Sequence, residues 1–195
     1  GKSGSGKSTL IDILAGILKD SAIKLKVDNK LIETEADRFY WQKKIGLIPQ
    51  NISIMNETLK ENILFGLNKD QYSNEKIIDV LKLSNLTNLL TKLPNGLEHK
   101  IKERGLNFSG GEIQRIGIAR ALIFNPEILI FDEATSALDT FTENEILQDI
   151  NLLKNKTIIM ISHRMNSLRY CDKIFLMDNG EIKDEGNFAK FNKIY

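Results

Sequence analysis

Two kinds of hydrophobic periodicity follow each other along this chain of 195 residues. After Lys7, apolar residues recur at helical spacing and predict a helix over residues 7–18. Alternating apolar and basic residues over 23–30, with a turn at their end, predict a short hairpin. An apolar run at 44–49 predicts a buried strand. From 57 to 93, leucine and isoleucine recur every three or four residues, and this pattern predicts an all-helical region.

The second half of the chain returns to strands that alternate with helices. Helices are predicted at 112–124, ended by an Asn-Pro pair, and at 142–153. Short apolar runs at 128–131 and 157–161 predict two buried strands. Residues 173–183 contain the turn sequence Asp-Asn-Gly between apolar residues, which predicts a second hairpin.

The order of these elements indicates the fold class. Buried strands separated by helices are typical of a parallel α/β sheet. The helical region interrupts that alternation once. We therefore predict a single domain over residues 1–195, with an α/β core at 1–50 and 111–195 and a helical subdomain inserted at 51–110.

Composition excludes some function classes. The 27 Lys and Arg residues nearly balance the 26 Asp and Glu residues, for a net charge of +1. This balance gives no electrostatic case for nucleic-acid binding, and we expect no nucleic-acid partner. The single cysteine, Cys171, excludes an internal disulfide. No apolar run reaches the roughly 20 residues of a membrane span, which still leaves a membrane-embedded partner open.

The first nine residues carry the most specific chemical pattern in the chain. They fit Gly-x4-Gly-Lys-Ser/Thr, the phosphate-binding loop that holds a nucleoside triphosphate and Mg²⁺. Glycines let the backbone approach phosphates, while amide groups at a helix N-terminus attract them. Lys7 is expected to reach the β- and γ-phosphates, and the Ser8 hydroxyl to ligate Mg²⁺. The predicted nucleotide-binding residues are Gly1, Lys2, Ser3, Gly4, Ser5, Gly6, Lys7, Ser8 and Thr9.

A loop of this kind lies between a strand and a helix. Here the helix follows, but the sequence starts at Gly1 with no strand before the loop and no initiator Met. We therefore expect this sequence to be part of a longer protein.

Two acidic residues, Asp132 and Glu133, follow the predicted strand at 128–131. A buried parallel strand would deliver them at its carboxyl end, beside the phosphate loop. Asp132 could then hold Mg²⁺, and Glu133 could orient or deprotonate an attacking water. Acids after an apolar strand are common in proteins, so the intact phosphate loop in the same chain is what favours the functional interpretation.

Residues 109–112 carry a second candidate anion site. Ser109 and Glu112 have the spacing of a capping box, which by itself predicts only a well-capped helix. Gly110 and Gly111 lie in the first turn, although glycine is costly in a helix. We interpret them as a means of presenting bare backbone amides to an anion.

Ser109-Gly110-Gly111-Glu112, with residues 114–122 behind it, resembles the Leu-Ser-Gly-Gly-Gln signature of ABC-transporter ATPase domains. Phe108 replaces the leucine of that pattern and Glu112 replaces the glutamine. The resemblance implies a P-loop NTPase fold, with a RecA-like parallel sheet core and an inserted helical subdomain. It also implies ATP and Mg²⁺ as cofactors.

Three further motifs of that family follow its order. Gln50 matches the Q-loop glutamine, Asp139 ends a segment similar to the D-loop (136–139), and His163 matches the switch histidine. The resemblance implies Lys7, Gln50, Glu133 and His163 as catalytic residues. It implies Ser8, Gln50 and Asp132 as ligands of Mg²⁺. It implies a head-to-tail dimer, in which a partner's nucleotide is contacted in trans by Ser109, Gly110, Gly111, Glu112 and Asp139.

Residues 56–63, 93–97 and 102–105 resemble segments of exporter-type ATPase domains. That likeness implies the motor domain of an ABC exporter at the cytoplasmic face of the plasma membrane (the inner membrane in bacteria), with a transmembrane domain fused upstream. It leaves the cargo open among lipid-linked sugars, lipids and peptides. The alternatives are a soluble ABC-type ATPase and a separately encoded importer subunit. Six apolar helices upstream would favour the exporter.

Overall fold

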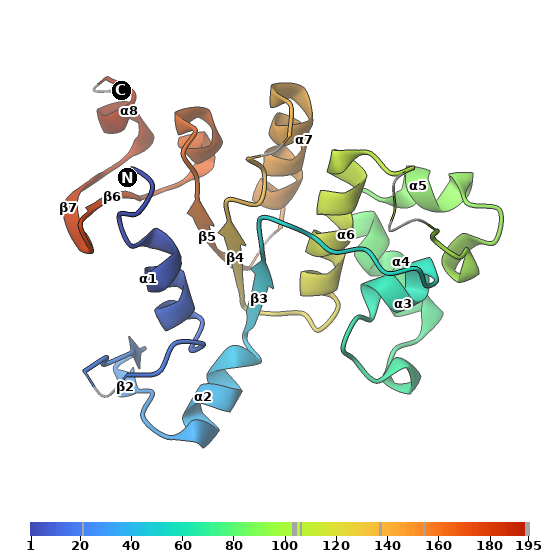
Figure 1. The fold of residues 1–195 in the computed structure, drawn as a ribbon, viewed down its shortest axis with the longest axis horizontal. Coiled ribbons are helices and arrows are strands. Elements are labelled where there is room, and N and C mark those ends of the chain that lie inside the picture. Colours follow the sequence, from blue (N-terminus) through green and yellow to red (C-terminus); the bar gives the residue numbers. More distant parts are fainter. Residues whose placement is uncertain (21, 103–104, 106, 137, 154, 194–195) are drawn as a thin grey trace. The chain divides into compact units, whose positions relative to one another are not determined.

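A computed structural model gives the fold of the chain (Figure 1). The structure describes residues 1–20, 22–102, 105, 107–136, 138–153 and 155–193. Contacts divide the chain into two compact units. The first unit comprises Gly1–Leu47, Pro126–Ser136 and Lys156–Tyr195, and the second comprises Ile48–Asn125 and Ala137–Asn155.

A three-stranded sheet with the order β3-β4-β5 runs through the first unit. Strands β4 (Ile128–Asp132) and β5 (Thr157–Ile161) are parallel, and β3 (Ile45–Ile48) lies on the other side of β4. The middle of β4 is almost inaccessible to solvent, as expected for a strand covered on both faces. The predicted α/β architecture with parallel strands is therefore confirmed.

Two helices cover this sheet with apolar side chains. Helix α1 (Lys7–Leu14) and helix α2 (Glu35–Gln42) are amphipathic, and Trp41 Nε1 donates a hydrogen bond of 2.6 Å to the Leu14 carbonyl. The core of the unit consists of Ile11, Ala15, Trp41, Ile45, Ile130 and Ile161.

The structure corrects the sequence prediction for both helices. Helix α1 ends at Leu14 because Gly16 takes a left-handed conformation (φ 68°), and the predicted continuation to residue 18 is wrong. Helix α2 was not predicted from the sequence. Its N-terminal signal is a capping box, in which the Thr34 hydroxyl accepts a 3.0 Å hydrogen bond from the Asp37 amide.

Both predicted hairpins are confirmed. Strands β1 (Lys26–Val27) and β2 (Lys30–Leu31) pair antiparallel, as do β6 (Ile174–Asp178) and β7 (Glu181–Gly186). Each turn has two residues at positive φ, the geometry that Asn and Gly tolerate best. A 3₁₀ helix at Met165–Tyr170 and the short helix α8 (Phe188–Phe191), which the sequence analysis did not predict, complete the first unit.

The second unit is helical, and α6 lies at its centre. Helix α6 packs against α3, α4 and α7 (Figure 1), and most of its side chains are buried. The α-helices of this unit are α3 (Leu59–Ile63), α4 (Asn74–Leu83), α5 (Thr87–Lys92), α6 (Gly110–Leu122) and α7 (Thr140–Asn151). Two 3₁₀ helices lie at Lys69–Gln71 and Gly96–Glu98.

Helices α6 and α7 confirm two sequence predictions, with small shifts of their ends. Each helix begins two residues earlier than predicted because Ser109 and Asp139 cap the N-termini, and each also ends two residues earlier. By contacts, both helices belong with the second unit. The division into a core at 1–50 and 111–195 and a subdomain at 51–110 stays a prediction. Among the described residues, no helix is long and apolar enough to cross a membrane.

Ile130 offers a test of the first unit's core. It is fully buried in β4, so we expect Ile130→Ala to lower the free energy of unfolding by about 2–5 kcal/mol through lost contacts and a residual cavity. Ile182→Ala removes the same atoms from β7 at a position that is 55% exposed, and we expect a change within about 0.5 kcal/mol. Urea unfolding followed by the fluorescence of Trp41, the single tryptophan, measures both. Equal losses would contradict this description of the core.

Candidate nucleotide-binding site

The phosphate loop of the first unit closes around Lys7. Gly4 (φ 77°) and Gly6 (φ 94°) take left-handed conformations, and Gly6 is the N-cap of α1. The Lys7 ammonium donates hydrogen bonds to the carbonyls of Gly1 (3.0 Å) and Lys2 (2.8 Å). The lysine is therefore held at the mouth of the loop, at the positive end of the helix dipole.

The β6–β7 hairpin packs against this loop and supports it. Ser5 is 3% exposed, and its carbonyl accepts a 3.0 Å hydrogen bond from the Gly180 amide. A β-carbon on Gly1 would lie 2.0 Å from the Met177 carbonyl oxygen, so a side chain there would collide with the hairpin. No local pattern in the sequence indicates this support. On the other side of the loop, Lys2, Ser3, Gly4, Ser8 and Thr9 are exposed to a ligand.

The carboxyl end of β4 carries the predicted acidic pair. Partial burial is the largest cause that raises the pKa of Asp132, and the nearby carboxylates of Glu133 and Asp12 add to it. The ammonium of Lys7 acts in the opposite direction and favours the ionised form. The electrostatic interaction between Lys7 and Asp132 indicates that the loop and the end of the strand lie near each other.

Glu133 and His163 meet although they follow different strands. His163 Nε2 contacts Glu133 Oε1, and their side chains are 40% and 21% exposed. The register of the parallel strands explains this, since Asp132 lies opposite Ile161. The Glu133 amide donates to the Ile161 carbonyl (3.2 Å). Glu133 also has a φ of 50°, a conformation uncommon outside glycine and asparagine that recurs at functional sites.

Arg164 ties the segment after β5 to the turn after β4, a contact that the sequence analysis did not foresee. Its Nη2 donates a 2.9 Å hydrogen bond to the Ser136 carbonyl. Its amide donates to the Ser162 hydroxyl at 3.0 Å. These bonds stabilise the backbone on both sides of His163.

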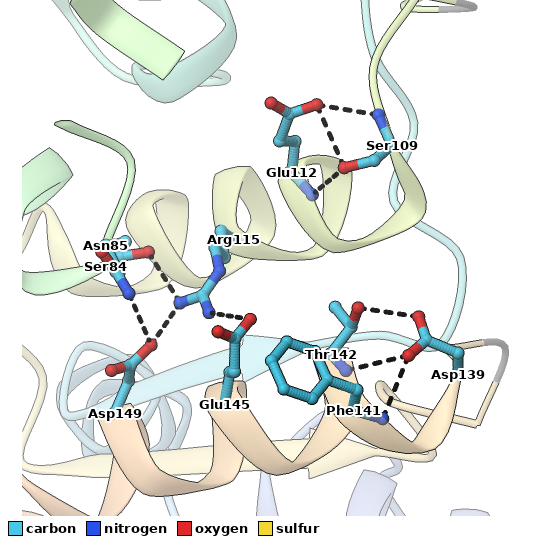
Figure 2. Close-up of polar contacts among 10 residues, drawn as sticks. All are labelled: Ser84, Asn85, Ser109, Glu112, Arg115, Asp139, Phe141, Thr142, Glu145 and Asp149. Atoms are coloured by element: carbon cyan, nitrogen blue, oxygen red, sulfur yellow. Dashed lines mark hydrogen bonds and ion pairs between the residues drawn. The ribbon is translucent and has the colours of Figure 1, made fainter. Parts of the chain in front are cut away.

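The second candidate anion site lies at the N-terminus of α6 (Figure 2). The Ser109 hydroxyl accepts from the Glu112 amide (3.2 Å), while the Glu112 carboxylate accepts from the Ser109 amide (2.8 Å) and hydroxyl (3.0 Å). The predicted capping box is therefore confirmed. Ser109 and Gly110 are exposed, whereas Gly111 is buried.

Packing supplies a reason for glycine at position 111 that the sequence analysis missed. A β-carbon on Gly111 would lie 2.5 Å from Thr142 Cγ2 on α7, closer than any ordinary contact. A β-carbon on Gly110 would lie 3.2 Å from Leu138 Cδ2, which is tight but less severe. At Gly111 the close approach of two helices therefore excludes a side chain.

Asp139 caps α7 in the same unit. Its carboxylate accepts from the amides of Phe141 and Thr142 (both 3.0 Å) and from the Thr142 hydroxyl (2.7 Å). The hydrogen bond from that hydroxyl is the main cause that holds the pKa of Asp139 below its usual value. The sequence analysis assigned Asp139 only a contact with a partner subunit, so this capping role is new.

The structure thus brings the predicted site residues together in two groups. Residues 1–9, Asp132, Glu133 and His163 belong to the first unit, and residues 109–112 and Asp139 to the second. Gln50 is exposed and also belongs to the second unit, and its predicted role stays a prediction. Three residues of the motifs quoted above lie outside the described residues: Glu103, Arg104 and Ala137.

The contact between Gly111 and Thr142 generates a prediction. We expect Gly111→Ala to lower the free energy of unfolding by about 1–3 kcal/mol through overpacking, although alanine is the better helix former. Adding Thr142→Ser removes the clashing methyl and keeps the hydroxyl that bonds Asp139, so the double variant should regain wild-type stability. Chemical denaturation of the two variants, with Thr142→Ser alone as control, measures this. A double variant no more stable than Gly111→Ala would refute the packing explanation.

Comparisons with known proteins agree with this geometry. The chain is 37% identical over 195 residues to a candidate export ATP-binding/permease protein of Rickettsia bellii, covering 99% of this chain and 33% of that protein. It is 39% identical over 189 residues to the mitochondrial iron-sulfur clusters transporter ATM1 of Saccharomyces cerevisiae, covering 95% of this chain and 27% of that protein. The chain therefore spans about a third of the length of these relatives.

A solved structure gives the same result for the fold. A bacterial Atm1-family ABC exporter with ATP bound matches 100% of this chain and 34% of its own, with a TM-score of 0.85 and 34% identity. A family profile described as ABC transporter matches residues 1–136. That match contains the phosphate loop, the capped N-terminus of α6 and the acids after β4. The chain therefore has the P-loop NTPase fold of a nucleotide-binding domain and belongs to the ABC transporter family.

Proposed function

We propose that this chain is the ATP-hydrolysing motor domain of an ABC exporter. The observation that carries the proposal is the pairing of Glu133 with His163 beside the phosphate loop of Lys7. A carboxylate, an imidazole and an ammonium on one site are the groups that phosphoryl transfer to water requires.

The residues of the loop have separate roles in this proposal. The backbone amides of the exposed residues Lys2, Ser3 and Gly4 and those at the start of α1 would surround the phosphates as an anion nest. Lys7 neutralises charge on the β- and γ-phosphates. Thr9, on the first turn of α1, adds a contact to the α-phosphate. ATP is the nucleotide that we propose.

The donor set also fits Mg²⁺. The metal favours oxygen ligands, and it often takes only one or two from the protein, with phosphate and water oxygens completing its shell. Ser8 offers an exposed hydroxyl, and Asp132 a carboxylate whose raised pKa reflects burial and a local excess of negative charge that a cation would relieve. We propose these two residues as ligands, with Gln50 as a third. Bound there, Mg²⁺ would neutralise charge on the transferred phosphoryl group.

Glu133 is the proposed general base, and His163 the residue that contacts the γ-phosphate. The contact between the two side chains supports this assignment, because it orients the carboxylate and the imidazole toward each other on one site. A base must lie within hydrogen-bond reach of the proton that it removes. The two strands that precede these residues hold the two side chains in contact without a bound substrate.

A second copy, or a related ATPase domain, completes the proposed site. We propose a head-to-tail dimer, in which Ser109, Gly110, Gly111, Glu112 and Asp139 of one subunit contact the nucleotide of the other. The exposure of Ser109, Gly110 and Asp139 supports this, as does the position of Ser109 and Gly110 at the positive end of the α6 dipole. ATP would then bridge two half-sites, and its hydrolysis would remove that bridge.

The relatives' names support the exporter over the alternatives. They describe export and transport proteins longer than this chain, so we propose a transmembrane domain as partner and the cytoplasmic face of a plasma membrane, the inner membrane in bacteria, as location. The cargo is not a property of an ATPase fold; lipid-linked sugars, lipids and peptides are the classes that we propose. A soluble ABC-type ATPase and an importer subunit are the alternatives.

Glu133→Gln tests the proposed base. The amide cannot accept a proton, so we expect kcat for ATP hydrolysis by the full-length protein to fall at least about a hundredfold while ATP still binds. Glu127→Gln is the matched control, because Glu127 precedes β4 and pairs with Lys44 (2.9 Å), not with a site residue. Phosphate release and binding of a fluorescent ATP analogue measure the two properties. Undiminished hydrolysis in Glu133→Gln would refute the assignment.

Ser109→Arg tests the contact in trans. A bulky cation at the N-terminus of α6 should block a partner's nucleotide sterically, so hydrolysis should fall while one subunit still binds ATP at its own phosphate loop. Ser73→Arg is the control, since Ser73 is an exposed N-cap of α4 outside the proposed site. ATPase assays and equilibrium binding distinguish the effects. Loss of ATP binding in Ser109→Arg alone would contradict a role in trans.

A further inference from the structure

Arg115 is a charged side chain buried within the second unit, and the proposed hydrolysis does not use it. It lies on α6 with 9% of its side chain exposed. Arginine is almost never buried this deeply unless a partner compensates its charge. The partners of Arg115 therefore indicate what the residue does.

Three helices meet at this guanidinium (Figure 2). On α7, Asp149 pairs with Arg115 Nη1, and Glu145 Oε2 lies 3.9 Å from Nη2. The same Nη1 donates a 3.4 Å hydrogen bond to the carbonyl of Ser84, the C-cap of α4. That carbonyl lies at the negative end of the α4 dipole. Asn85 Nδ2 also donates to Asp149, at 3.3 Å.

Helices α6 and α7 touch at a second point, near their beginnings, where Gly111 packs against Thr142. From this contact to the ion pair of Arg115 and Asp149, both helices run forward in sequence, so they lie side by side in the same direction. Figure 2 shows Ser109 and Asp139 on one side of the view, and Ser84 and Asp149 on the other. The two N-caps therefore lie at one end of the helix pair.

We propose that Arg115 and Asp149 are a positioning pair, which fixes α6 against α7 so that Ser109 and Asp139 reach a partner's nucleotide together. The proposal rests on the contact in trans argued above. The contact at Gly111 holds the helices together near their beginnings, and the ion pair adds a directional contact farther along that helps to fix their relative orientation. Buried ion pairs often add little net stability, so a defined geometry is the better explanation for this one.

Variants of the pair in the full-length protein test the functional part. Arg115→Met and Asp149→Asn remove one charge each at nearly constant volume. We expect kcat for ATP hydrolysis to fall by about tenfold or more, since small misplacements far from the chemistry carry such costs. The Kd for ATP at the phosphate loop should stay within about twofold, because that loop belongs to the first unit. Arg115→Lys should have a higher kcat than Arg115→Met but a lower one than the wild type, because lysine keeps the charge but cannot donate two parallel hydrogen bonds as a guanidinium does.

Arg120 provides the matched control. It lies on the same helix, but its guanidinium bonds the carbonyls of Asn62 (2.6 Å) and Ser53 (2.7 Å), which are not on α7. Arg120→Met therefore removes an arginine of α6 without touching the contact with α7. We expect it to destabilise the second unit and to leave the distance between the beginnings of α6 and α7 unchanged.

A distance measurement tests the positioning without relying on hydrolysis. Spin labels on cysteines at the exposed positions Asn107 and Thr140 report the separation of the two helix beginnings, after Cys171, the single cysteine of this sequence, is replaced by serine. We expect pulsed electron resonance to give a broader or shifted distance distribution in Arg115→Met and Asp149→Asn, but not in Arg120→Met.

The two measurements separate the possible failures. An unchanged distance distribution in both Arg115→Met and Asp149→Asn overturns the positioning pair, whatever the ATPase rate. A broadened distance distribution with an unchanged kcat also overturns the proposal that the pair serves the contact in trans. In that case the pair positions the helices, and the proposed contact of Ser109 and Asp139 with a partner's nucleotide is what fails. If Arg115→Met does not fold, Asp149→Asn and Arg115→Lys still decide, because each keeps the shape of the side-chain cluster.

Discussion

The parallel pairing of β4 and β5 is the constraint on which the nucleotide site depends. Its register sets Asp132 opposite Ile161, so the residues that follow each strand, Glu133 and His163, emerge side by side. The bond between the Glu133 amide and the Ile161 carbonyl extends that pairing beyond the strand ends. A slip by one residue would turn every side chain to the opposite face and separate the two groups. The apolar residues of β4, buried on both faces, thus hold the contact between Glu133 and His163 in place.

The sequence predicted those parts of the site that are encoded locally. The phosphate loop and the acids after β4 have fixed spacing, and the turns of both hairpins carry residues that favour positive φ. Helix α2 was missed although its capping box, from Thr34 to Asp37, is a local signal. The support of the phosphate loop by Gly180 could not be predicted, because it joins residues far apart in the chain through backbone atoms, which carry no sequence signal.

Two different constraints act on the glycines at the start of α6: packing against α7 and the presentation of backbone amides. Interpreted from the sequence, they free backbone amides for an anion. Gly111 is also needed because Thr142 leaves no room for a β-carbon, while Gly110 is exposed and less crowded. Packing therefore requires glycine at position 111, while ligand binding is the reason that we propose for glycine at position 110. A substitution at Gly111 therefore tests the packing, and a substitution at Gly110 tests the presentation of backbone amides.

The carbonyls that hold Lys7 have a consequence for the binding of phosphate. A free lysine side chain loses considerable rotational freedom when it grips an anion, and that loss weakens association. Here the loop already restricts the side chain through Gly1 and Lys2. A phosphate that binds Lys7 therefore replaces hydrogen bonds to these carbonyl oxygens, and the lysine side chain loses little further rotational freedom. A polyphosphate offers several oxygens at once, so it can replace the hydrogen bonds that these carbonyls make with Lys7.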